Sequence, residues 1–175
     1  MTSGAATLQT GRLRLREMDE LRDASFILRL VNDPDWLRFI GDRNVHNLAD
    51  AQVYIREGPR RMYELHGLGL YLMERKADRE PMGLCGLIKR ETLVDVDIGF
   101  ALLPEFRGRG YVYEAGIAVL HHAQSVLGLE RVVAITTADN IASGRVLEAL
   151  GLRFERMIQL EPEGEDLRLY GTSFT

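Results

Sequence analysis

One stretch of fourteen residues, LLPEFRGRGYVYEA at Leu102–Ala115, joins the end of an extended apolar segment to the start of a helical pattern. Its turn, RGRG at Arg107–Gly110, contains two glycines, which let backbone N–H groups come close to a ligand. A helix that starts directly after such a turn presents unpaired N–H donors and a partial positive charge, and both attract phosphate. The stretch therefore predicts a strand, a turn and a helix that together bind pyrophosphate, although a glycine turn can also be plain loop geometry.

The segments on either side of the turn support the ligand-binding interpretation. Residues 93–103 alternate between apolar side chains, from Val94 to Leu102, and small or acidic ones that include Asp95 and Asp97. This period of two predicts a strand with one core face. From Val112 to Leu127 apolar residues recur every three or four positions, which predicts a helix of about five turns that Gly128 ends. The dinucleotide fingerprint GxGxxG and the P-loop GK[ST] are both absent.

The rest of the chain alternates short strands and helices without repeats. This order implies an α/β sandwich around a largely antiparallel sheet, with residues 10–175 as a single domain after a flexible tail at residues 1–9. The expected helices are Asp19–Val31, one that starts near Asn47 and is interrupted at Gly58-Pro59, and Ile141–Leu150. The further expected strands are Leu13–Arg16, Gly69–Arg75, Met82–Arg90, Val132–Thr136, Leu152–Gln159 and Asp166–Phe174.

Composition narrows the class of protein. The chain has 175 residues and a formal net charge of −4, which gives no support to a nucleic-acid surface. No apolar run approaches the roughly 20 residues that a membrane span needs. The single cysteine, Cys85, lies in an apolar segment and is expected to be a buried strand residue, in keeping with a reducing cytoplasm. The four histidines lack metal-ligand spacing, so no metal is expected.

A further pattern identifies a family. Arg107 and Gly110 at the strand-to-helix junction are followed by Asn140-Ile141-Ala142-Ser143 and then by Leu150-Gly151-Leu152. This arrangement resembles the GNAT N-acetyltransferase superfamily, and the segment TGRLRLREMDELRDA with Asn32-Asp33-Pro34 resembles its branch of ribosomal-protein N-terminal (alanine) acetyltransferases. Two positions depart from the family. Val112 replaces a usual Gly or Ala and would crowd the backbone near the pyrophosphate, and Leu147 replaces a tyrosine general acid.

The resemblance implies a mixed, mostly antiparallel sheet of about seven strands, flanked by about four helices and splayed between two central strands. It also implies acetyl-CoA as co-substrate. The pantetheine arm would pair with the backbone of the acidic strand, and the turn would hold the pyrophosphate. Asn140 would contact the cofactor or cap the following helix, or do both. The implied cofactor-binding residues are Phe100, Ala101, Leu102, Arg107, Gly108, Arg109, Gly110, Tyr111, Val112, Tyr113, Asn140 and Ser143.

Direct transfer to an amine needs a base and some help for the departing thiolate. By resemblance Asp97, in Asp97-Ile98-Gly99-Phe100, is the candidate general base; it could instead be a solvated carboxylate. Asp95 is its substitute and a candidate substrate contact. Ser143 is the candidate donor to the sulfur, or else it caps its helix.

The acceptor is less constrained than the co-substrate. Trp36 lies in the region that, by resemblance, roofs the acceptor pocket, where an aromatic residue contacts substrate or belongs to the core. The sequence favours an N-acetyltransferase acting on a protein N-terminus or a small-molecule amine in a ternary complex. A catalytically silent acyl-CoA-binding module is the alternative, because Leu147 removes the acid. Neither nucleic acid nor membrane is an expected partner, and the sequence leaves a homodimer open.

Overall fold

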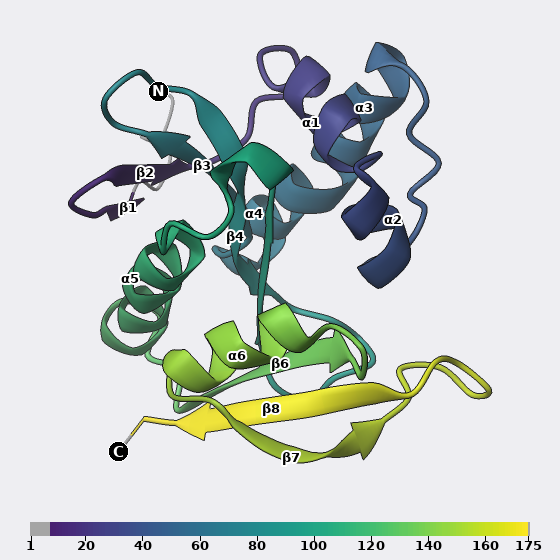
Figure 1. The fold of residues 1–175 in the computed structure, drawn as a ribbon, viewed down its shortest axis with the longest axis vertical. Helices are drawn as coiled ribbons and strands as arrows, with labels where there is room; N and C mark the ends of the chain where they lie inside the picture. The colour runs from purple at the N-terminus through teal and green to yellow at the C-terminus, as the bar shows by residue number, and fades with distance from the viewer. Residues whose placement is uncertain (1–7, 175) are drawn as a thin grey trace.

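A single mixed sheet runs through the computed structural model, which describes residues 8–174 (Figure 1). It has eight strands in the order β1-β2-β3-β4-β5-β6-β8-β7. All neighbouring strands are antiparallel except β5 and β6, which are parallel. The mixed, mostly antiparallel fold is confirmed, with one strand more than expected. The strands are β1 Leu8–Gln9, β2 Leu13–Arg16, β3 Leu70–Arg75, β4 Pro81–Ile88, β5 Asp97–Leu102, β6 Arg131–Thr137, β7 Arg153–Ile158 and β8 Leu167–Ser173.

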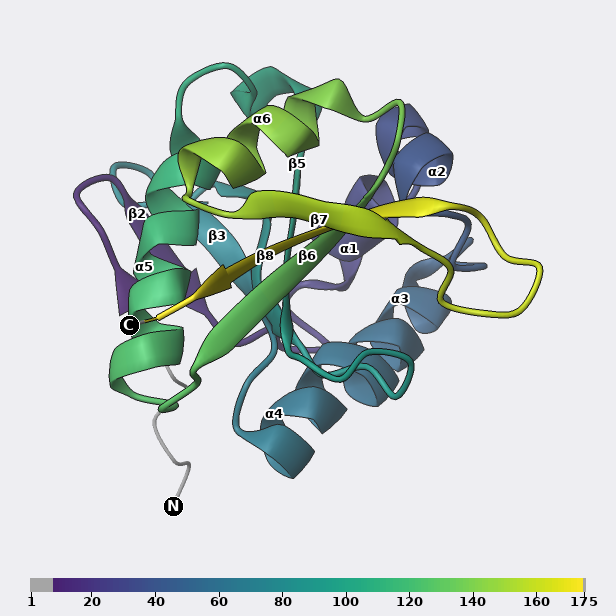
Figure 2. The same cartoon turned by 90° about the horizontal axis from the view of Figure 1, so that it is seen from below.

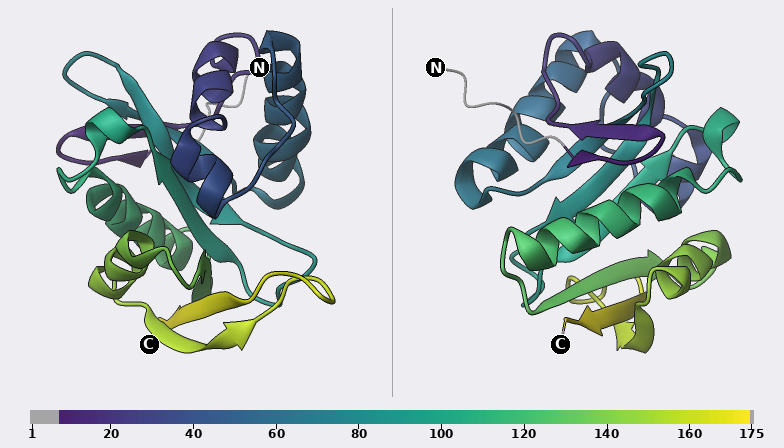
Figure 3. Two further views of the ribbon diagram at one scale, coloured as in Figure 1. Left: turned by 45° about the vertical axis from the view of Figure 1, so that its right-hand side comes forward. Right: turned by 90° about the vertical axis from the view of Figure 1, so that its left-hand side faces the viewer.

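Helices cover both faces of this sheet. Helices α1 to α4 lie on one face, and α5 with α6 on the other (Figure 3). No helix within residues 8–174 is both long enough and apolar enough to cross a membrane. The α-helices are α1 Ala24–Leu30, α2 Pro34–Phe39, α3 Leu48–Ile55, α4 Arg61–His66, α5 Tyr111–Ser125 and α6 Ile141–Ala149.

The helical half before β3 differs most from the sequence-based expectation. The helix expected from Asp19 begins only at Ala24, because the Asp19 carboxylate accepts backbone N–H groups in a preceding turn. Helix α2 was not expected; Asp33 caps it, and Pro34 fits its first turn. The expected interruption at Gly58-Pro59 is wrong. A π-helical segment, Arg56–Arg60, continues α3 into α4, and its wider turn accommodates a proline that has no N–H to donate.

Three boundaries also change around the glycine turn and the N-terminus. Strand β5 begins at Asp97 rather than at residue 93, so Val94 is 91% exposed and is not a core residue. Helix α5 ends at Ser125, shorter than expected, and Val126 is exposed. Part of the expected flexible tail is ordered, because Leu8–Gln9 pairs with β2; residues 1–7 of that tail lie outside the described residues.

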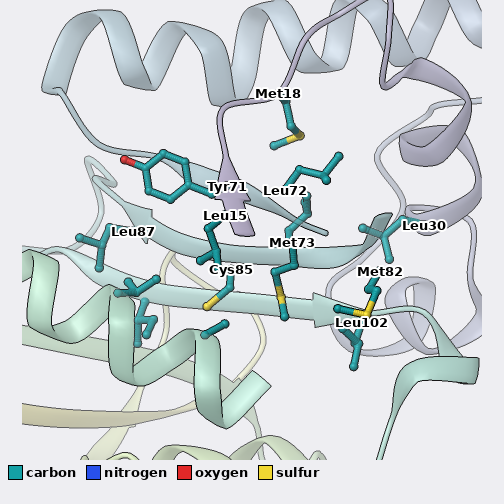
Figure 4. Close-up of a cluster of buried hydrophobic side chains, with 14 of the residues drawn as sticks. Leu15, Met18, Leu30, Tyr71, Leu72, Met73, Met82, Cys85, Leu87 and Leu102 are labelled. Atoms are coloured by element: carbon teal, nitrogen blue, oxygen red, sulfur yellow. The ribbon is translucent and has the colours of Figure 1, made fainter. Parts of the chain in front are cut away.

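Fully buried side chains gather where β2, β3 and β4 lie between the two helical layers. Leu15, Leu72, Met73, Met82 and Cys85 each expose no surface, and the last three bring sulfur atoms into this layer (Figure 4). Cys85 is thus a buried strand residue, as expected. Flexible methionine side chains fill irregular space between the sheet and its helices.

A buried ion cluster ties the N-terminal segment to the sheet. The Arg16 guanidinium on β2 donates to both Asp23 oxygens at 2.9 and 2.8 Å, and to the Glu74 carboxylate on β3 at 3.0 Å. All three residues are less than 10% exposed. Because a buried charge without its partner is costly, this cluster fixes the approach to α1 against the end of β3.

Replacing Arg16 by Met should therefore lower the free energy of unfolding by about 3–5 kcal/mol, since the buried Asp23 carboxylate loses its partner and Glu74 keeps only Arg14 Nε, 3.7 Å away. The exposed pair Arg56–Glu20, 2.9 Å apart, offers a matched control. Arg56→Met should cost less than about 1 kcal/mol, because water solvates both charges. Denaturant unfolding measures both values; equal losses in the two variants would contradict the structural role of the cluster.

Candidate active site

The sheet opens between its two central parallel strands. Strand β5 pairs with β4 along residues 97–102, whereas it pairs with β6 only where Asp97 lies opposite Val133. Figure 2 shows β6 leaving β5 at an angle beyond this point. The splay inferred from the family resemblance is therefore present, and it leaves one edge of β5 without a strand partner.

The direction of the β5 peptide groups follows from two hydrogen bonds. Val133 N–H donates to the carbonyl of Val96 on the β6 side, and Leu103 N–H donates to Met82 on the β4 side. Because peptide groups of an antiparallel strand alternate between its two edges, those of Ile98 and Phe100 face the β6 side and those of Ala101 face β4. The Ile98 N–H still belongs to the bridge between Asp97 and Val133, so Phe100 is the residue whose peptide groups face the gap. The expectation that the Ala101 backbone faces a ligand is therefore wrong; this residue lines the cavity beside β5 without turning its peptide groups to the gap.

The glycine turn has the conformation that its sequence predicts. Gly108 and Gly110 have φ values of 77° and 78°, in the left-handed region that favours glycine. Gly110 precedes α5, and no side chain caps the helix there. The N–H groups of residues 111–113 thus remain available as donors. Val112 packs against the core, and the helix starts at Tyr111 beside it, so the expected crowding does not displace the helix start.

The Arg107 side chain forms its hydrogen bonds with groups outside the glycine turn. Its guanidinium bonds the carboxylates of Asp33 at 3.0 Å and Asp35 at 2.5 Å, and the carbonyl of Leu102 at 2.9 Å. The Leu102 carbonyl therefore already has a donor inside the protein. Arg109 does not line the cavity, and its carbonyl accepts from Arg12 at 3.0 Å. Arg107 thus connects α2 to the end of β5.

The gap, the turn and the helices above them enclose a cavity of about 700 Å³. Most of the site residues expected from the sequence line it, although they come from segments more than 100 residues apart. Asp95 and Arg109 do not line it. Those that do are Trp36, Asp97, Phe100, Ala101, Leu102, Arg107, Gly108, Gly110, Tyr111, Val112, Tyr113, Asn140 and Ser143.

Asp97 is the buried carboxylate of this cavity. It is only 1% exposed, so the alternative of a solvated carboxylate is wrong. Arg90 Nε donates to Asp97 Oδ1 over 2.9 Å. Burial raises the pKa of Asp97 above its usual value because the charged form loses hydration, and Arg90 opposes that shift only in part. A more basic carboxylate that faces a cavity is a better proton acceptor than an ordinary aspartate.

Helix α6 brings the remaining candidates to the other side of the gap. The Asn140 side chain accepts from Ser143 N–H at 3.2 Å, so its capping role is confirmed, and its amide nitrogen has no acceptor among residues 8–174. Ser143 is half-buried and lines the cavity. One turn later, Leu147 also lines the cavity and is 1% exposed. An apolar side chain therefore occupies the position of the family tyrosine.

Of the two candidate substrate contacts, Trp36 and Asp95, only Trp36 lines the cavity. Trp36 is 5% exposed and lines the cavity, and its indole N–H has no acceptor among the described residues. Asp95 precedes β5, is half-buried, and accepts from Arg131 at 3.2 Å. Asp95 is therefore paired on another part of the surface and does not serve as a substrate contact in this cavity.

Three polar residues are among the lining residues that the sequence analysis missed: Arg43, Tyr54 and Arg90. Arg90 could have been found from strand alternation. Ile88 lies opposite Asp97, and a period of two puts Arg90 on the same face as Ile88. Arg43 lies in the loop after α2 and Tyr54 on α3, where local pattern gives no indication of the cavity. Within residues 8–174, no group of three or more His, Cys, Asp or Glu side chains could hold a metal ion.

The raised pKa of Asp97 predicts a measurable dependence of stability on pH. Above the ordinary pKa of 3.8 the folded protein holds this proton more tightly than the unfolded chain, so stability falls as pH rises towards the folded-state pKa. Asp97→Asn removes this titration. We therefore expect the variant to gain stability relative to wild type between pH 4 and pH 7, as measured by urea unfolding.

Arg90→Gln should increase the pH dependence that Asp97→Asn removes, because Arg90 lowers the pKa of Asp97. That variant should lose more stability than wild type over the same pH interval. A difference between wild type and Asp97→Asn that is identical at both pH values would show that Asp97 is an ordinary solvated carboxylate.

Comparisons with known proteins agree with this geometry. The protein named Uncharacterized N-acetyltransferase YoaA of Bacillus subtilis is 28% identical over 153 residues, which is 87% of this chain and 85% of that protein. An acetyltransferase structure from Agrobacterium tumefaciens has a TM-score of 0.82 at 21% identity and covers 99% of this chain and 98% of its own. The ribosomal-protein-S5-alanine acetyltransferase structure from Vibrio fischeri has a TM-score of 0.78 at 18% identity and covers 96% of both chains, a likeness of fold. A family model described as an acetyltransferase (GNAT) domain matches residues 12–153, and the chain therefore belongs to the GNAT family of acetyltransferases.

Proposed function

We propose that this protein transfers the acetyl group of acetyl-CoA to a primary amine by direct transfer in a ternary complex. The amine belongs to a protein N-terminus or a small molecule. The observation that carries the proposal is the position of Asp97, a buried carboxylate of raised pKa, where β5 and β6 separate and a cavity begins. A base at that point is available to an amine that meets a thioester in the gap.

The chain's own groups suit the co-substrate. Beyond the pair Asp97–Val133, Phe100 offers its peptide groups along an open strand edge, to which an extended amide chain such as pantetheine can add like a strand. Backbone N–H groups from Gly108 to Tyr113 surround the uncapped start of α5 and suit a pyrophosphate. The free amide nitrogen of Asn140 is a further donor, since its oxygen caps α6.

Asp97 and Ser143 divide the chemical roles. The amine nitrogen bonds to the thioester carbonyl carbon, the carbon–sulfur bond breaks, and Asp97 accepts the proton that the nitrogen loses, directly or through water. Burial brings the pKa of Asp97 closer to the operating pH, which makes that transfer more effective. Ser143 Oγ donates a hydrogen bond to the departing sulfur. A thiolate whose conjugate acid has a pKa of about 8.5, as for cysteine, needs less help than an amine would.

Direct transfer is favoured because Cys85, the single thiol of the chain, is poorly suited to carry the acetyl group. Cys85 exposes no surface and does not line the cavity. Burial raises its pKa to about 12, so the nucleophilic thiolate is scarce at neutral pH.

A silent acyl-CoA-binding module is the second candidate, and Leu147 favours it. This buried apolar side chain has no acidic proton to donate at the position where relatives have a tyrosine. Release of free thiol from acetyl-CoA in the presence of an amine separates the two: the enzyme releases thiol, whereas the module binds CoA without doing so.

The acceptor preference follows from amine protonation. An α-amine with a pKa of about 7.7–8.0 is neutral in roughly a tenth to a sixth of molecules at pH 7, whereas a lysine amine with a pKa of about 10.4 is neutral in only about 0.04%. Only the neutral amine attacks. An α-amino group, or another amine of depressed pKa, is therefore the preferred acceptor over an unperturbed lysine.

We expect Asp97→Asn to lower turnover by about 10²–10⁴-fold with little change in acetyl-CoA affinity, because a general base is lost while the gap and the turn remain. Ser143→Ala should reduce turnover less. Thiol release measures turnover, and calorimetry measures affinity. Asp95→Asn is the matched control, since Asp95 is paired with Arg131 outside the cavity. Near-normal turnover in Asp97→Asn together with a large loss in Asp95→Asn would reverse the assignment.

A further inference from the structure

The charged groups of the cavity are divided between its two ends. At the end of β5, Asp33 and Asp35 share the single guanidinium of Arg107, which leaves an excess of negative charge. At the start of β5, Arg90 pairs with Asp97, and Arg43 also lines the cavity. The five residue steps from Asp97 to Leu102 separate these ends by about 17 Å. The end that holds the proposed base therefore carries an excess of positive charge.

The arginines at this end have unused donors. Arg90 bonds Asp97 through Nε, and its two terminal nitrogens have no carboxylate partner among residues 8–174. Arg43 forms no ion pair within the same residues. Both guanidinium groups lower the pKa of Tyr54, which burial raises, so both lie near its phenol. A planar guanidinium with free N–H groups binds a carboxylate with good geometry.

The surrounding walls are apolar. Phe39, Ile40, Met62 and Leu87 line the same cavity, and they come from α2, the residue after it, α4 and β4. Such walls favour burial of an apolar group and give no partner to a second ammonium group. The acidic segment that precedes β5 does not change this balance, because Asp95 is paired with Arg131.

We propose that the acceptor is a molecule of the amino-acid type, with a primary amine, a free carboxylate a few bonds away and an apolar side chain. This inference rests on the N-acetyltransferase function proposed above. The amine lies beside Asp97, the carboxylate lies against Arg43 and the terminal nitrogens of Arg90, and the side chain packs on the apolar walls. A polyamine would instead place a second positive charge against the arginines, and an ordinary peptide N-terminus has no carboxylate at this distance.

The test compares L-leucine with L-leucinamide, which match in shape and differ in the carboxylate. Because the free amino acid has the more basic amine, the informative quantity is the ratio of kcat/KM for leucine to that for leucinamide in each variant. Arg43→Gln should lower this ratio about tenfold or more, since a charge-assisted hydrogen bond is lost. Arg61→Gln is the matched control: Arg61 is exposed on α4, pairs with Glu57 and does not line the cavity. Its ratio should equal that of wild type.

Each outcome decides the inference. An unchanged ratio in Arg43→Gln overturns it. So does a wild-type enzyme that acetylates leucinamide and neutral peptides but not leucine at any pH, while the N-acetyltransferase function then stands. A peptide with aspartate at its second position is a third substrate in the test. If kcat/KM for this peptide alone depends on Arg43, the arginine binds a peptide carboxylate and the amino-acid acceptor is wrong. If CoA binds but no amine in the panel releases thiol, the proposed function itself fails, and the inference fails with it.

Discussion

Strand β5 keeps its hydrogen bonds to β4 along its length but meets β6 only at its first residue. The rest of the site depends on this incomplete pairing. Peptide groups inside a protein need partners, and those of Phe100 face a gap where the sheet supplies none. The same separation opens the cavity between α2, β5 and α6, and it leaves Asp97 at the point where the strands part. A bound chain of amides can complete the sheet there.

Ion pairs hold the two ends of β5 in place. Arg107 bonds Asp33, Asp35 and the Leu102 carbonyl, so it fixes the turn before α5 relative to α2. Arg90 positions the buried Asp97 carboxylate while burial keeps its pKa raised. One arginine thus gives rigidity to the region that suits pyrophosphate, and the other orients the proposed base. The length of β5 keeps these two ion-pair groups apart.

Local sequence pattern predicted the strand, the turn and the helix, because glycine conformation and periodicity are local properties. The family resemblance supplied the site residues, most of which line the cavity. Local pattern failed where distant segments decide the outcome. Alternation placed Asp97 on one face of a strand but could not show that helices bury that face. The π-helical turn at Pro59 and the capped helix α2 depend on packing against the sheet. Arg43 acquires its position only when the loop after α2 folds over the cavity.

Hydrogen exchange of the backbone amides, with and without saturating acetyl-CoA, tests the central claim most directly. If the open edge of β5 and the start of α5 hold the co-substrate, exchange should slow at Phe100 and at residues 111–113. The amides of β5 that already pair with β4 should change little. Protection confined to another surface, such as the groove between Leu8–Gln9 and α5, would contradict the account.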